Sequence, residues 1–266
     1  MTDANKLPRH ALPAEFAGMF MIVFLGTAAV GAMVWTGAVF GQWEISVAWG
    51  GAVALAICVA APFSGAHLNP AVTIALWLLG RAPGRWVAPF LVAQFLGGLV
   101  GAAASYMIYR PAIERFLVEQ ALEPGTPSIL KAAGVFTTYA HSSLSWGGAF
   151  AVEFLITGIL MIVVLACGSG DRAIRQGMPM ALVVGLLVAV IGAATGPLTG
   201  FALNPARDLA PRFGLWLLGW GDIVMSGGND WAYAWIPVIA TTAGACAGAL
   251  LYQFLVGRHA DRAAKA

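Results

Sequence analysis

Charged residues are scarce in this sequence. Fourteen basic and twelve acidic residues make up 10% of its 266 residues, and 60% are hydrophobic, whereas roughly a quarter of an average soluble chain is charged. So few polar side chains cannot cover a soluble fold of this length. The shortage therefore excludes a soluble protein and predicts one surrounded by lipid. The net charge of only +2 also argues against a nucleic-acid partner.

Cysteines are also few, and no two of them stand close together. Cys58, Cys167 and Cys246 each lie inside an apolar run, so we expect neither a disulfide framework nor a zinc site, and interpret all three as small core residues. The apolar segments contain no nucleophile–base pair, phosphate loop or metal-ligand cluster. We therefore expect no enzyme, no metal and no cofactor.

What the sequence does contain is long apolar segments. A helix needs about 20 mostly apolar residues to cross roughly 30 Å of hydrocarbon. Six segments approach or reach this length: residues 12–35, 45–62, 86–109, 147–168, 178–194 and 233–256. Glycine is frequent, at 33 residues, which inside apolar sequence indicates closely packed helices. The predicted fold class is an all-α polytopic membrane protein with six transmembrane helices.

Two further apolar segments are too short to cross. Asn69-Pro70-Ala71 opens the first and Asn204-Pro205-Ala206 opens the second. Asn is a favoured N-cap and Pro suits the first helical position, so both motifs predict a helix start. The first helix is expected to run from Pro70 to about Leu79, or about 15 Å at 1.5 Å per residue. This is half of a bilayer, so we expect two re-entrant half-helices, the second ending near Leu218.

The two short segments belong to an internal repeat. Glu15-Phe16 opens the first span and Glu153-Phe154 opens the fourth, and the Asn-Pro-Ala motif follows the second span of each half. Three spans per half make the repeat inverted. We expect one channel domain over residues 1–266, with repeats at 12–109 and 147–256 joined by an outer loop at 110–146.

The repeat predicts a polar passage at the bilayer midplane. Irregular backbone at this depth is tolerated only where it lines a cavity, and two half-helix N-termini place two positive dipole ends there. Cations and protons are repelled at such a point, while each Asn amide can donate a hydrogen bond. The predicted cargo is small, uncharged and rich in hydrogen-bonding groups.

The positive charges predict an orientation. Most Lys and Arg residues of the connections fall on the side of the two chain ends, and this side is normally cytoplasmic. We expect a multi-pass protein of the cell membrane, in contact with lipid, with both termini in the cytoplasm.

The paired motifs resemble those of the major intrinsic proteins, the aquaporins and glycerol channels. The resemblance covers nearly the whole chain and is strongest to the bacterial glycerol uptake facilitators, through residues 40–47, 64–77 and 196–208. The sequence departs from the family pattern at residues 81–85 and 110–146. The family implies a homotetramer with a pore in each subunit, but no residue of the sequence establishes this assembly.

The resemblance also implies a set of site residues. The selectivity filter would comprise Trp49, Gly192, Phe201 and Arg207. The pore-lining carbonyls would belong to Gly65, Ala66, His67, Leu68, Gly200, Phe201, Ala202 and Leu203. Glu15 and Glu153 would accept hydrogen bonds from the re-entrant loops, and Asp208 would support them.

Arg207 can be argued from the sequence without the family. A cation in the first turn of a helix opposes the helix dipole, and an arginine at membrane depth is costly, so packing alone would not place it there. The first repeat has Val72 at the matching position. The predicted filter is therefore one-sided.

The sequence is compatible with three functions, of which the first is the best supported. A passive channel for glycerol and similar polyols, with some water, is the leading hypothesis. A water-selective channel is disfavoured by Gly192, where such relatives generally have histidine, and by Asp208. A coupled secondary transporter would need intramembrane ionisable groups, and only the symmetric Glu15 and Glu153 are available.

Overall fold

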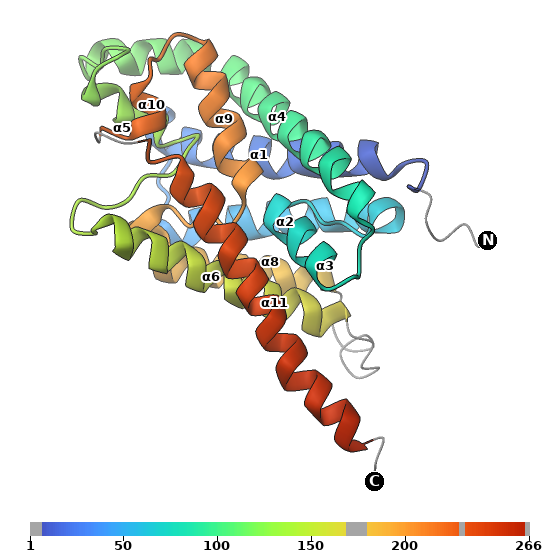
Figure 1. Ribbon diagram of the computed structural model, residues 1–266. Helices are drawn as coiled ribbons and strands as arrows, with labels where there is room; N and C mark the ends of the chain where they lie inside the picture. The colour runs from blue at the N-terminus through green and yellow to red at the C-terminus, as the bar shows by residue number, and fades with distance from the viewer. Residues whose placement is uncertain (1–6, 169–179, 229–231, 264–266) are drawn as a thin grey trace.

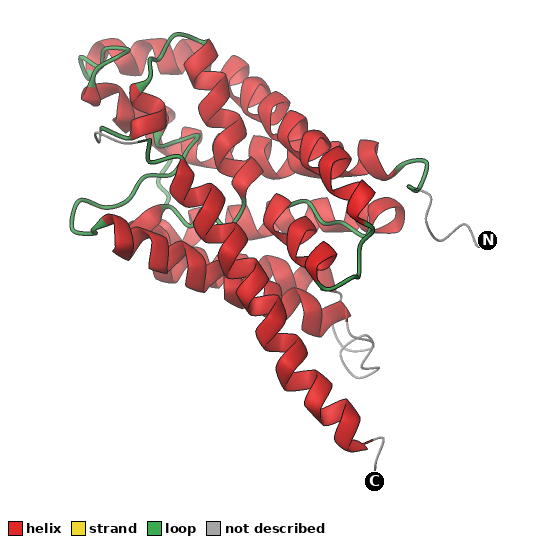
Figure 2. Ribbon diagram, viewed as in Figure 1, coloured by secondary structure: helices red, strands yellow, loops and turns green. Residues whose placement is uncertain are grey.

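The computed structural model describes residues 7–168, 180–228 and 232–263. Helices form the whole regular structure of these residues, without strands (Figure 2). Six of the helices are long and apolar enough to cross a membrane. They are α1 (Ala11–Thr36), α2 (Gln42–Ser64), α4 (Gly84–Glu119), α6 (Trp146–Gly168), α8 (Met180–Thr199) and α11 (Trp235–Ala263). The predicted all-α class with six spans is confirmed.

The two half-helices are α3 (Pro70–Leu78) and α9 (Pro205–Leu217). Both begin at the proline of their motif, because the preceding Asn residue is extended and caps the helix. Short helices η2 (Pro127–Ile129), α5 (Leu130–Ala133) and α10 (Ile223–Ser226) lie in the connections. In Figure 1, α1 begins and α11 ends at the end of the bundle opposite to α5 and α10.

Glycines allow matching helix pairs to touch in the two halves. A side chain at Gly97 would collide with the Phe16 carbonyl of α1, and one at Gly244 would collide with the Phe154 carbonyl of α6. Phe16 and Phe154 follow the two repeat glutamates. The pairs α1–α4 and α6–α11 therefore cross at corresponding points, as expected of an inverted repeat.

Some predicted boundaries differ from the structure. The segment expected to be an outer loop from residue 110 begins as helix, because α4 continues to Glu119. Arg110 pairs with Glu114 and Arg115 with Glu119 on this extension. The apolar pattern ends at Tyr109 and Pro111 follows, but a helix can leave the lipid and continue with a polar surface. The predicted start of the fifth span, Met178, lies outside the described residues, and that helix extends past Ala194 to Thr199.

The interpretation of all three cysteines as core residues was wrong for one of them. Cys167 is buried and Cys246 is partly buried, but Cys58 on α2 is exposed. An apolar sequence context does not separate a lipid-facing position from an interior one, because both are apolar in a membrane protein.

Candidate functional site

The two Asn-Pro-Ala motifs hold each other in the centre of the molecule. The Asn69 side chain accepts from Ala71 N at 2.8 Å and donates through Nδ2 to the Leu203 carbonyl at 2.9 Å. Asn204 accepts from Ala206 N at 3.0 Å and donates to the Leu68 carbonyl at 2.7 Å. Each amide group has two N–H bonds, so Asn69 keeps one for a passing molecule. Asn204 Nδ2 also donates to the Met19 sulfur at 3.6 Å, which is a weak acceptor that a passing molecule can replace.

The motif's other residues do not face the passage. Pro70, Pro205 and Ala206 lie along an apolar groove between α4 and α11, on the far side of the half-helices from the central cavity. Ala71 is fully buried. These residues start and pack the half-helices, and only the asparagines reach the cavity.

The backbone before each motif is strained in the same way. Ala66 and Leu68 in the first half have φ of 54° and 49°, and Phe201 and Leu203 in the second half have φ of 41° and 57°. Gly65 and Gly200 open both segments in the left-handed region. Each such non-glycine residue costs about 1–3 kcal/mol unless its surroundings hold it. Three of the four residues in each segment thus lie in the left-handed region, which keeps these segments from folding as right-handed helix.

Two buried carboxylates hold these segments in place. Glu15 accepts from His67 N at 2.9 Å and Leu68 N at 2.6 Å, and also from Ser64 Oγ and Gln94 Nε2. Hydrogen bonds to a charged group contribute about 1.5–3 kcal/mol each, which offsets the backbone strain.

Glu153 occupies the matching place in the second half. It accepts from Ala202 N at 2.9 Å, Leu203 N at 3.1 Å and Thr199 Oγ1 at 2.6 Å. Both glutamates are fully buried.

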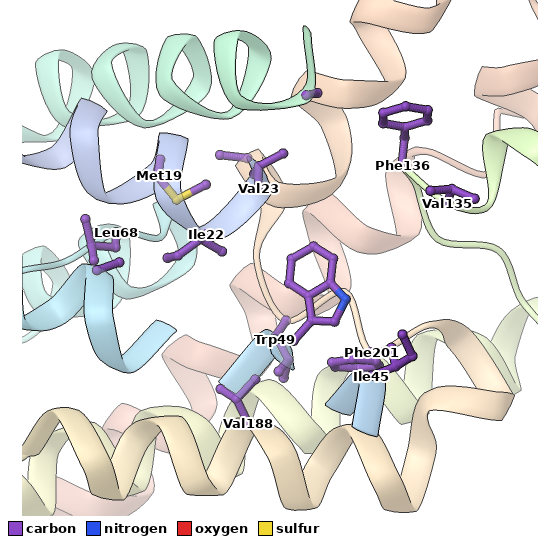
Figure 3. Close-up of a cluster of buried hydrophobic side chains, with 14 of the residues drawn as sticks. Met19, Ile22, Val23, Ile45, Trp49, Leu68, Val135, Phe136, Val188 and Phe201 are labelled. Carbon is purple, nitrogen blue, oxygen red and sulfur yellow. The ribbon is translucent and has the colours of Figure 1, made fainter. Parts of the chain in front are cut away.

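The four residues assigned to the filter come together. The rings of Trp49 and Phe201 meet edge to face with centroids 6.3 Å apart. The Arg207 guanidinium carbon lies 3.9 Å from the centroid of the Trp49 ring. A side-chain carbon at Gly192 would lie only 3.0 Å from the Phe201 ring. Figure 3 shows Trp49 projecting into the interior beside Phe201, with Ile22 and Leu68 further along.

Two cavities meet at this corner. The inner cavity, of about 70 Å³, contains both motif asparagines, Ala66, His67, Leu68, Ala202 and Leu203. The outer cavity, of about 210 Å³, reaches Gly200. Trp49, Phe201 and Arg207 line both, so anything that passes between the cavities passes these three side chains. Gly65 is not among the residues that line either one.

The carbonyls of Leu68 and Leu203 also accept hydrogen bonds from within the protein. Both were expected to line the passage, and both residues border the inner cavity. Each carbonyl also accepts the Asn amide of the opposite half. Their contribution to the passage is therefore limited to the remaining lone pair.

The Arg207 side chain is bonded to the segment between α4 and α6. Its Nη1 donates to the Phe136 carbonyl at 3.1 Å, and its side chain is nearly buried, at 6% exposure. Phe136 belongs to the segment between α4 and α6, far from Arg207 in sequence. The position of the Arg207 side chain therefore depends on this outer segment.

Arg212 is a buried residue beside this site that the sequence did not single out. It is fully buried and donates to both carboxylate oxygens of Asp208, at 2.9 and 3.0 Å, and to the carbonyls of Thr138 and Val224. Asp208 also accepts from the Thr138 N–H at 2.6 Å. Asp208 therefore supports the outer segment, in place of the re-entrant loops. The spacing of four residues within one helix was the available signal.

The rings of Tyr139 and Tyr233 cover Arg212, with its guanidinium carbon 4.7 and 5.7 Å from their centroids. Burial raises the pKa of the Tyr139 phenol, while the Arg212 charge acts in the opposite direction. The phenol is therefore neutral at ordinary pH. Within the described residues, no group of three His, Cys, Asp or Glu side chains could hold a metal ion.

Residues 4–252 match the model of a family described as the major intrinsic protein family. The chain belongs to this family. Its relatives within the family include the glycerol uptake facilitator protein of Haemophilus influenzae, 46% identical over 91% of this chain and 92% of the relative. The propanediol uptake facilitator PduF of Citrobacter freundii is 44% identical over 92% and 91%. The glycerol uptake facilitator protein of Pseudomonas aeruginosa is 45% identical over 94% and 90%.

A solved structure agrees with this family assignment. The aquaglyceroporin from Plasmodium falciparum has a TM-score of 0.82 to this chain at 32% identity, covering 95% of this chain and 98% of that one. The predicted resemblance to the family is confirmed over nearly the whole chain.

Proposed function

We propose that this major intrinsic protein is a passive channel for glycerol and similar small neutral polyols. Water passes as well to some extent, and ions and protons are excluded. The observation that carries the proposal is the single corner of Trp49, Phe201 and Arg207 shared by the two cavities. The names of the relatives, which include glycerol and propanediol uptake facilitators, support the same class of solute.

The corner suits a molecule with one apolar and one polar side. Trp49 and Phe201 offer ring surfaces to the CH and CH2 groups of a polyol, and Arg207 donates hydrogen bonds to its hydroxyl oxygens. Gly192 leaves open the space that a side chain would fill. Beyond the corner, the second N–H groups of Asn69 and Asn204 replace the hydrogen bonds that the solute had with water. For Asn204 the solute takes the place of the weak contact with the Met19 sulfur.

Exclusion of cations follows from the charges around the passage. Arg207 carries a full positive charge at the corner, and the N-termini of α3 and α9 bring two partial positive charges to the midplane. Both asparagines donate to the molecule at the centre, so a water there orients its oxygen toward them and cannot relay a proton.

The proposal is tested by stopped-flow light scattering on liposomes that contain the purified protein. We expect glycerol influx much faster than in empty liposomes, since the protein provides hydrogen bonds that the lipid lacks. Arg207→Val, which copies Val72 of the first repeat, should reduce glycerol selectivity and leave the fold intact. Glycerol influx no faster than in empty liposomes would falsify the proposal.

A water-selective channel is the second candidate. The corner argues against it, because Phe201 packs against Gly192 and leaves no room there for a histidine side chain. Water influx that is fast in liposomes where glycerol influx is not would favour this candidate over the first.

A coupled transporter is the third candidate. Its driving ion would need Glu15 or Glu153, and both carboxylates are already occupied by backbone N–H groups. Glycerol flux that depends on a proton or sodium gradient would support coupling, whereas we expect flux that follows the glycerol gradient alone.

We further propose a homotetramer in the lipid of the cell membrane, with both termini in the cytoplasm, and an activity that needs no enzyme chemistry, cofactor or metal. The common end of the bundle where α1 begins and α11 ends supports the placement of the termini (Figure 1). Native mass spectrometry tests the tetramer. Labelling of a cysteine introduced near either terminus, in intact and opened cells, tests the orientation.

A further inference from the structure

We propose that the Met19 sulfur on α1 is a positioning partner of the motif residue Asn204, and that it makes the two motif asparagines unequal donors to a solute. The inference rests on the proposed function, because it concerns how the centre of the passage holds a neutral solute. Met19 was not among the residues to which the sequence pointed.

The orientation of the Asn204 amide follows from its backbone contacts. Its Oδ1 accepts from the N–H groups of Ala206 at 3.0 Å and Arg207 at 3.2 Å. An NH2 group could not accept these bonds, so the NH2 group is the other end of the amide. One of its N–H bonds donates to the Leu68 carbonyl at 2.7 Å. A single N–H therefore remains for any further partner.

The remaining N–H has the Met19 sulfur as its partner. Asn204 Nδ2 donates to Sδ at 3.6 Å, and a thioether sulfur is a weak acceptor. Met19 is fully buried and does not line either cavity, whereas Asn204 borders the inner one. The sulfur therefore approaches the amide from within the protein, and a solute oxygen approaches it from the cavity. The two compete for one N–H.

Close packing around α1 fixes the position of Met19. A side-chain carbon at Gly97 on α4 would lie 3.0 Å from Met19 Cβ, so Met19 uses space that the glycine leaves free. Figure 3 shows Met19 in the same buried cluster as Ile22 and Leu68. Methionine fills apolar gaps and carries a polarisable sulfur. It can therefore offer Asn204 an acceptor without burying a strongly polar group.

The other half of the repeat differs at this point. Met19 stands four residues after Glu15, and the matching residue four after Glu153 is Thr157. The Thr157 hydroxyl donates to the Glu153 carbonyl of its own helix at 2.7 Å. Asn69 donates one N–H to the opposite half, and its second N–H is bonded to none of the described residues. Asn69 thus offers the solute a whole N–H, while Asn204 offers one that it shares with the sulfur.

A shared donor suits a passage that must release what it binds. A buried donor without a partner is costly, and the sulfur satisfies Asn204 between one solute and the next. Because sulfur accepts weakly, a hydroxyl oxygen can displace it. Conduction needs binding that is favourable enough to admit a solute and weak enough to let it leave. Asn69 therefore holds the solute more firmly than Asn204 does.

Solid-state NMR of protein labelled with ¹⁵N-asparagine, in liposomes, tests the contact directly. The sequence has four asparagines, and the two motif residues are distinguished by the residues before them, His67 and Ala202. Met19→Leu removes the sulfur at nearly constant volume. We expect the amide proton signal of Asn204 to shift in this variant and that of Asn69 to stay. An unchanged Asn204 signal would overturn the proposal whether or not the protein conducts glycerol.

Met161→Leu on α6 is the control, because Met161 is also fully buried and its sulfur has no hydrogen bond to a described residue. It should leave the Asn204 signal in place. A shift as large as that in Met19→Leu would mean that repacking, and not the sulfur contact, causes the change.

Adding glycerol to the same samples tests the unequal donors. In the unaltered protein we expect the Asn69 signal to move further than the Asn204 signal, and in Met19→Leu we expect the two to move by similar amounts. Signals that both move equally in the unaltered protein would contradict the inequality. If neither signal responds to glycerol, the proposed function fails, and the shift in Met19→Leu still decides the sulfur contact.

Glycerol flux in liposomes tests the consequence with two opposite changes. Met19→Leu should raise the flux roughly twofold, because the solute no longer competes with the sulfur for Asn204. Met19→Gln keeps the length of the side chain and brings a strong acceptor to the amide, so it should lower the flux roughly two- to tenfold. Flux that changes in the same direction in both variants, or in neither, would remove Met19 from control of the passage.

Discussion

At the residue scale, Gly192 shows how an absent side chain leaves room for the Phe201 ring in the proposed filter. An added carbon would lie 2.8 Å from Ser46 Oγ and 3.0 Å from two atoms of the Phe201 ring. Real side-chain carbons essentially never come as close as the first contact, so Phe201 or Ser46 must move. The Phe201 ring therefore requires glycine at position 192.

We predict that Gly192→Ala lowers glycerol flux several-fold while the protein still folds, because the displaced Phe201 ring narrows the corner. Stopped-flow measurements of glycerol and water in the same liposomes would show it. The control is Gly51→Ala on α2, where an added carbon meets nothing within 4 Å. Equal glycerol flux in the two variants would contradict the prediction.

A substitution at Phe201 tests the effect of widening the corner. Phe201→Ala should raise the flux of polyols larger than glycerol, because it removes one wall of the corner and leaves the left-handed backbone at this position occupied by a non-glycine residue. A series of polyols of increasing length measures the cutoff. An unchanged cutoff would mean that Phe201 does not limit the passage.

At the scale of elements, the two re-entrant segments depend on their glutamates. Glu15→Gln replaces an oxygen that accepts hydrogen bonds by an NH2 group that must face other donors, and Glu153→Gln does the same in the second half. We predict a loss of about 3 kcal/mol in stability for each, in line with the hydrogen bonds to charge that are lost. Thermal unfolding in detergent measures it. The control is Glu119→Gln at the exposed end of α4, and destabilisation no greater than in this control would count against the role.

The buried pair of Asp208 and Arg212 connects α9 to the outer segment that holds Arg207. Arg212→Met leaves Asp208 as a buried charge without its partner, which typically costs about 3–5 kcal/mol. We also expect lower glycerol selectivity, since the Phe136 carbonyl loses its support. Arg115→Met removes a pair of the same spacing at an exposed site and should change neither property. If a folded Arg212→Met protein kept its glycerol selectivity, the Asp208–Arg212 pair would have no role in the selectivity of the filter.

The elements could be predicted from the sequence where one local signal decides them. The start of α3 at Pro70 follows from Asn, Pro and the apolar run behind them, and the six spans follow from length and hydropathy. The end of α4 could not be predicted, because the apolar pattern stops at Tyr109 whereas the helical backbone hydrogen bonds continue to Glu119. Arg212 was missed for a related reason. An arginine in the outer part of a half-helix is interpreted as a surface charge unless its carboxylate partner and the carbonyls around it are known.

The candidate site divides in the same way. Asn69, Asn204 and Arg207 could be singled out from their place in the repeat. Trp49, Gly192 and Phe201 needed the family resemblance, since an aromatic residue in a membrane protein is ordinarily part of the packing. The network of Glu15, Gln94, Thr73 and His67 joins three segments distant in sequence, so only the structure brings it together.

At the scale of the whole molecule, the scarcity of charge serves two purposes. It places the chain in lipid, and it leaves few charges near the passage. Glu15 and Glu153 are bound by the re-entrant backbone, Asp208 and Arg212 neutralise each other, and Arg207 lies at the corner between the two cavities. The passage is therefore polar and positive, which suits neutral solutes.

The most direct test of this account measures glycerol and proton permeability in the same protein-containing liposomes, with an internal pH dye and light scattering. The account predicts glycerol permeability far above that of empty liposomes and proton permeability equal to theirs, because Arg207 and the two half-helix ends exclude the cation. Proton permeability that rises together with glycerol permeability as more protein is added would contradict it.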